Sequence, residues 1–108
     1  MVVIKWEKDN TCDYEFYDLY AYTNHSKKII AYLYWFENRW IMVHQIPKLK
    51  IKRQYDNYSI EEVNNVLFKA ILDIQSDLNK ISHICNDYLD AIFDYITDYI
   101  QGIDYNEN

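Results

Sequence analysis

The chain has 108 residues, of which 50% are apolar and 18% are aromatic, and its formal net charge is −6. This composition excludes an intrinsically disordered chain. No apolar run reaches the roughly 18–20 residues that a membrane helix needs. The length suits a single compact domain, which we expect to span residues 1–108.

The first half of the chain alternates apolar and polar residues with a period of two, which is typical of half-buried strands. The stretch "KKIIAYLYWF", residues 27–36, is apolar on both faces like a central strand, and a polar trio separates it from "WIMVHQI", which indicates a hairpin. After Pro47, "KLKIKRQY" alternates lysine with apolar residues, as an exposed edge strand would. We therefore predict an antiparallel β-meander of four or five strands over residues 2–54.

The second half has helical periodicity. Ser59 and Glu62 have the spacing of a capping box, and apolar residues recur at helical intervals from Ile60 to Ile100. A single helix of this extent would be about 60 Å long at roughly 1.5 Å per residue, too long for a domain of this size. We expect a break near residues 82–86, since an unbroken helix would have to pack on another chain. The predicted fold is α+β: the meander, then one long or two shorter C-terminal helices over residues 59–101, packed on one face.

The last helix carries an acidic stripe without any basic residue, in the run "NDYLDAIFDYITDYIQG" at residues 86–102. On a helical wheel, four aspartates fall within about 80° of each other, namely Asp87, Asp90, Asp94 and Asp98. Three tyrosines border the stripe: Tyr88, Tyr95 and Tyr99. The apolar residues of the opposite side are expected to face the sheet; they are Leu89, Ile92, Phe93, Ile96 and Ile100.

Successive carboxylates of this stripe stand about 4.5–6 Å apart along the helix axis, the same order as the spacing of phosphates along a nucleic-acid strand. Like charges at this spacing destabilise a helix by a few tenths of a kcal/mol per pair, a cost that a basic partner surface would offset. One interpretation is the solvated face of an acidic protein. The other is a ladder that imitates phosphates and occupies a nucleic-acid-binding protein. Weak cation binding is a third, for which helical aspartates without loop ligands are poorly suited.

The middle of the chain is basic. Residues 25–54 carry seven basic and one acidic side chain, whereas residues 55–108 carry two basic and eleven acidic ones, which indicates two surfaces of different charge. The alternative nucleic-acid-binding residues are Lys48, Lys50, Lys52 and Arg53, with Lys27, Lys28 and Arg39 nearby and Tyr32, Tyr34 and Trp35 for base stacking. The competing explanation is that lysines protect an edge strand from pairing with another chain.

Motifs for catalysis or metal binding are missing from the sequence. It contains no G-x-S-x-G, P-loop or H-E-x-x-H motif. His25 beside Ser26 lacks the geometry of a nucleophile–base pair, and His83, Cys85 and Asp87 lack the paired spacing of a zinc site. We expect no enzyme activity, no cofactor and no metal. Two isolated cysteines and a first segment unlike a signal peptide favour a cytoplasmic protein without membrane contact.

Small size, acidity and aromatic surface favour a protein that works by binding another protein. The primary hypothesis is a cytoplasmic inhibitor of the kind that phages and mobile elements encode, such as anti-CRISPR or anti-restriction proteins. Such a protein would act as a DNA mimic, blocking a nucleic-acid-binding or processing protein through the acidic helix face; the attribution is an analogy of class. The alternatives are a nucleic-acid-binding module that uses the basic edge strand and the aromatic sheet, and a self-assembling structural protein, with a homodimer as its simplest form.

Overall fold

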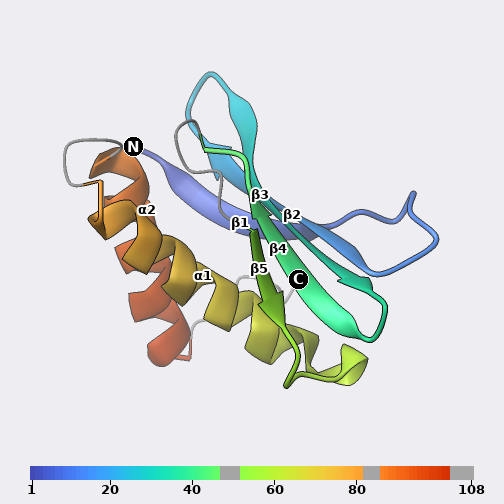
Figure 1. Cartoon of the computed structure of the whole chain (residues 1–108). Helices are drawn as coiled ribbons and strands as arrows, with labels where there is room; N and C mark the ends of the chain where they lie inside the picture. The colour runs from blue at the N-terminus through green and yellow to red at the C-terminus, as the bar shows by residue number, and fades with distance from the viewer. Residues whose placement is uncertain (47–51, 82–85, 103–108) are drawn as a thin grey trace.

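A computed structural model describes residues 1–46, 52–81 and 86–102 of the chain. Five strands form one antiparallel sheet in the order β1-β2-β3-β4-β5, and the helices lie together on one side of it (Figure 1). The strands are β1 (Val3–Lys8), β2 (Phe16–Tyr22), β3 (Lys27–Phe36), β4 (Arg39–His44) and β5 (Lys52–Tyr55). The helices are a short 3₁₀ turn η1 (Ile60–Glu62), α1 (Val63–Asn79) and α2 (Asn86–Ile100). The predicted α+β fold, a meander followed by C-terminal helices, is confirmed.

The described part of the C-terminal half contains two α-helices rather than one. The backbone N–H of Ser59 donates to the Glu62 carboxylate at 2.9 Å, which confirms the capping box and starts the helical region with η1. Helix α1 ends at Asn79 and α2 begins at Asn86, so the helical region is interrupted where the sequence predicted. Residues 82–85 themselves lie outside the described residues. Within the described part of the chain, no helix combines the length and apolar character needed to cross a membrane.

One face of the sheet forms the core with both helices. On this face Trp6 pairs with Leu19, and Trp40 pairs with Tyr55. Several large side chains there are completely buried, among them Leu19, Leu33, Trp40, Ile71, Ile74 and Ile92. Full burial of such a side chain stabilises the fold by about 1.5–3 kcal/mol before conformational entropy is counted, so the sheet and the helices are held by a common apolar cluster.

The opposite side of the sheet is aromatic, and we call it the open face because none of the described helices covers it (Figure 1). The strand register places Phe16, Asp18, Tyr20, Tyr22, Tyr32 and Tyr34 on this face. The rings of Phe16 and Tyr34 are stacked with centroids 5.5 Å apart, and Tyr32 lies 5.4 Å from Phe16. The aromatic alternation of the sequence therefore produces a surface of touching rings.

Helix α2 is turned about its axis relative to the sequence expectation. Ala91 and Ile92 are buried, whereas Phe93 is 63% exposed and Ile100 is 74% exposed. The prediction that Phe93 and Ile100 face the sheet is therefore wrong. The physical reason is that α2 packs against both β1 and α1, and the rings of Tyr88 and Tyr95 fill that corner.

The β3–β4 hairpin turns on two residues with left-handed backbone, Glu37 (φ 52°) and Asn38 (φ 62°). Two-residue loops of this kind favour Asn-Gly. We expect the double change Glu37→Asn with Asn38→Gly to raise the free energy of unfolding by about 1 kcal/mol, because it relieves the Cβ crowding of left-handed residues. Urea unfolding followed by circular dichroism measures the difference.

The matched control for this turn is Asn10→Gly. Asn10 lies in another turn but has no positive φ, so glycine there adds only freedom to the unfolded chain and brings no gain. A hairpin variant no more stable than the wild type would contradict the prediction.

Candidate functional site

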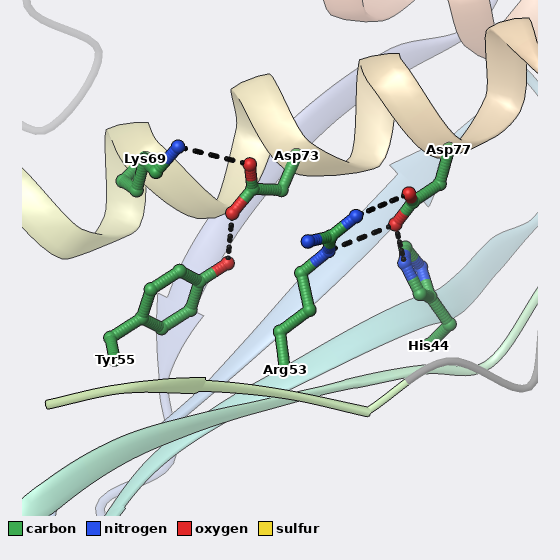
Figure 2. Close-up of polar contacts among 6 residues, drawn as sticks. All are labelled: His44, Arg53, Tyr55, Lys69, Asp73 and Asp77. Atoms are coloured by element: carbon green, nitrogen blue, oxygen red, sulfur yellow. Dashed lines mark hydrogen bonds and ion pairs between the residues drawn. The ribbon is translucent and has the colours of Figure 1, made fainter.

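A buried polar network joins helix α1 to strands β4 and β5 (Figure 2). The carboxylate of Asp77, on α1, accepts hydrogen bonds from both Nε and a terminal nitrogen of Arg53, at 3.2 and 2.5 Å. The ring nitrogen Nε2 of His44 lies 3.0 Å from the same carboxylate. One turn earlier, Asp73 accepts hydrogen bonds from the Tyr55 hydroxyl at 2.7 Å and from Lys69 at 3.1 Å. Sequence reasoning did not identify this network.

The Asp77 carboxylate is held in its charged form by its donors, whereas Nδ1 of His44 is buried without a hydrogen-bond partner among the described residues. Burial pushes the pKa of Asp77 upward, but the hydrogen bonds from Arg53 and His44 outweigh burial and hold that pKa below its ordinary value of 3.8. Burial, and then the neighbouring Asp73, raise the pKa of the Tyr55 hydroxyl, which therefore remains a donor. Asp77 is consequently ionised at neutral pH.

A carboxylate beside a histidine is also an arrangement found in active sites, so its accessibility decides its role. The side chains of His44 and Asp77 are both 0% exposed, and a substrate cannot reach them from solvent. We interpret the network as the attachment of helix α1 to the sheet.

The acidic stripe predicted from the sequence lies on the outside of α2. Asp87, Asp90 and Asp94 are exposed and Asp98 is half-buried. None of the four forms a salt bridge with a residue that the structure describes. The carboxylates are therefore available to a partner along the helix.

The three tyrosines that border the stripe differ in how deeply they are buried. Tyr88 and Tyr95 are half-buried and pack against the core. Tyr99 is more exposed, and its ring stacks on Phe68 of helix α1 with centroids 4.1 Å apart. The tyrosines thus contribute mainly to the packing of α2, and they also border the acidic stripe.

An exposed aromatic side chain, Phe93, lies beside the aspartate stripe and was missed by the sequence reasoning, which assigned it to the core. It helps to line an open recess of about 230 Å³ between β1 and α2, together with Met1, Val3, Asp94, Thr97, Asp98 and neighbouring residues. Met1 and Val3 are also exposed. We call Asp87, Asp90, Phe93, Asp94 and Asp98 the α2 surface: an acidic stripe with an exposed aromatic ring along one edge.

The basic residues predicted as an alternative site do not form one patch within the described chain. Lys52 and Arg53 are consecutive on β5 and project to opposite faces; Lys52 is exposed, and Arg53 points toward α1 and binds Asp77. Lys48 and Lys50 lie outside the described residues. Of the aromatic residues suggested for stacking, Tyr32 and Tyr34 are on the open face, whereas Trp35 packs beside Trp40 at 5.4 Å on the helix side.

His83 and Cys85 also lie outside the described residues. In the remainder of the chain, the described His, Cys, Asp and Glu side chains form no group of three placed to hold a metal ion. Comparisons of the chain with protein-family models, with curated proteins and with solved structures found no match.

The change Asp77→Asn tests the structural role of the network. We expect it to lower the free energy of unfolding by about 3 kcal/mol, because removing one partner of a buried ion pair leaves the other uncompensated. The matched control is Asp73→Asn, whose side chain is 13% exposed whereas that of Asp77 is 0% exposed, with an expected cost of about 1 kcal/mol. Equal losses in the two variants would contradict this ranking.

The pH dependence of stability follows from the same carboxylate. Because the pKa of Asp77 is lower in the fold than its ordinary value of 3.8, its ionisation stabilises the fold above that pH. This contribution is lost as the pH falls through the folded pKa. Urea midpoints measured from pH 6 to pH 2 should therefore fall more steeply for the wild type than for Asp77→Asn. Parallel curves would contradict the assignment.

Proposed function

We propose that this protein works by binding another protein through the α2 surface, and that the partner presents cationic side chains around an apolar pocket. The observation that carries the proposal is the exposed Phe93 ring beside a stripe of aspartates that form no salt bridge within the described chain. Interfaces commonly place an aromatic anchor at the centre and charged groups at the rim. A merely solvated helix face has no need of a large exposed ring beside its charges.

The partner that this surface fits best is itself a nucleic-acid-binding or processing protein. Its binding cleft is lined with Lys and Arg that are placed for successive phosphates. Carboxylates that repeat about every 4.5–6 Å along a helix offer charges at a comparable interval. The protein would then act as an inhibitor by nucleic-acid mimicry. A reducing compartment such as the cytoplasm suits this role, in keeping with the free thiol of Cys12.

The first experiment is a pull-down from host lysate with the tagged protein, with and without nuclease. We expect a nuclease-resistant partner that binds DNA or RNA when tested alone. Recovery that disappears on nuclease treatment would contradict the proposal and support direct nucleic-acid binding.

Charge reversal then locates the contact. The triple change Asp90→Lys, Asp94→Lys and Asp98→Lys is expected to weaken binding to the recovered partner at least 100-fold. The matched control reverses three acids outside α2, namely Asp13, Glu37 and Glu61, each changed to Lys for the same change in net charge. All three of these residues are exposed. Circular dichroism verifies that both variants remain folded, and an equal loss in both would show that only net charge matters.

The single change Phe93→Ser tests whether the exposed ring contributes to binding. It removes the ring while leaving every carboxylate in place. Because Phe93 is 63% exposed, the variant should fold with unchanged stability, and truncation of an interface anchor typically costs 2 kcal/mol or more, about 30-fold in affinity. Titration calorimetry with the purified partner measures the change, and unchanged affinity would remove Phe93 from the contact.

A further inference from the structure

The open face contains a buried acidic side chain that the α2 surface does not explain. Asp18 lies in the middle of β2 and is 7% exposed. Phe16 and Tyr20 flank it along the strand, and it pairs with Tyr32 of β3 and with Glu7 of β1. Among the residues that the structure describes, none donates a hydrogen bond to its carboxylate.

This placement is energetically unfavourable in the isolated chain. Burial raises the pKa of Asp18, and the nearby carboxylates of Asp9 and Glu7 raise it further, against a weaker opposing effect from Lys27. The Asp18 oxygens keep some contact with water, but a carboxylate that is largely withdrawn from water and receives no hydrogen bond from the described chain costs free energy. Like charges directly opposite each other across two strands also destabilise a sheet. Such a group in a folded protein needs a specific explanation, and binding is one.

Lys27 shows which chemistry suits this region. Its ammonium nitrogen lies 4.1 Å from the centroid of Tyr20 and 5.5 Å from that of Tyr22. The same nitrogen is 3.4 Å from the Glu7 carboxylate. A cation over an aromatic face and beside a carboxylate is a favourable combination. Lys27 is engaged with Glu7, and the described chain donates no hydrogen bond to Asp18.

We propose that the open face binds an arginine side chain from a basic segment of a partner protein, with Asp18 as its carboxylate anchor and Phe16 and Tyr32 as its flanking rings. Arginine suits the site better than lysine, because a planar guanidinium stacks on rings and donates two parallel hydrogen bonds to one carboxylate. Access requires the flanking rings to rotate, a change that is common at interfaces. The rings alone would also suit nucleic-acid bases, but the Asp18 carboxylate, which forms no ion pair with the described chain, repels phosphate.

This site lies on the side of the sheet opposite the helices, so it does not depend on the function proposed for α2. The test uses ¹⁵N-labelled full-length protein titrated with the blocked peptide acetyl-(Arg-Gly-Gly)₃-amide. A second peptide replaces each arginine with citrulline, which keeps the shape and removes the charge. We expect the arginine peptide to shift the amide resonances of Phe16, Asp18 and Tyr32, and the citrulline peptide to bind at least tenfold more weakly.

The variant Asp18→Asn isolates the carboxylate. It removes an unfavourable buried charge, so we expect it to fold with a melting temperature no lower than that of the wild type and to bind the arginine peptide at least tenfold more weakly. Glu61→Gln is the matched control, since it makes the same change in charge at an exposed residue outside the sheet, and its affinity should be unchanged.

Three outcomes would overturn this inference. Equal binding of the arginine peptide by wild type and Asp18→Asn would show that the Asp18 carboxylate does not take part in binding. Shifts confined to α2 would assign the peptide to the acidic stripe, which the triple α2 variant distinguishes because it should leave binding at the open face intact. Tighter binding of a single-stranded oligo(dT)₁₂ than of the peptide, unaffected by Asp18→Asn, would assign the rings to nucleic acid.

Discussion

The hydrogen bonds of the Asp77 carboxylate fix the arrangement of the whole molecule. This charge is enclosed between α1 and the sheet, and it is satisfied by Arg53 of β5 and His44 of β4 together (Figure 2). Because the donors come from two strands, α1 cannot slide or turn without leaving a buried charge unpaired, at a cost of several kcal/mol. Apolar packing supplies most of the stabilisation, and the ion pair fixes the register of the helix on the sheet.

The position of α1 in turn determines which side of α2 meets water. Helix α2 packs in the corner between β1 and α1, where Tyr99 stacks on Phe68. Tyr88 and Tyr95 turn toward the core and Phe93 turns outward. The exposed acidic stripe and the exposed ring beside it are therefore products of one packing arrangement.

Periodicity in the sequence was sufficient for the strands, the helices, the capping box at Ser59 and the break between helices, since each is a local property of the chain. Periodicity could not show which side chains meet in the tertiary structure. Arg53 belonged to a basic run, and only the pairing of β5 shows that its side chain meets Asp77. A helical wheel placed the tyrosines of α2 at a border and Phe93 in the core, whereas Tyr88 and Tyr95 pack against the core and Phe93 is exposed. Asp18 left a visible signal, because it occupies the one polar position in an alternating row of aromatic residues.

The two components of the α2 surface differ in how far their influence extends through water. The field of exposed carboxylates reaches a partner at a distance of about 8–10 Å at ordinary ionic strength, whereas the Phe93 ring acts only in contact. For any cationic partner, the aspartates accordingly govern the rate of encounter, which decreases as salt is added. In the proposed complex, the ring would govern how long the two proteins stay bound, a contribution that depends little on salt because the ring is uncharged. Groups that would speed association and a group that would slow dissociation thus lie within one turn of the same helix.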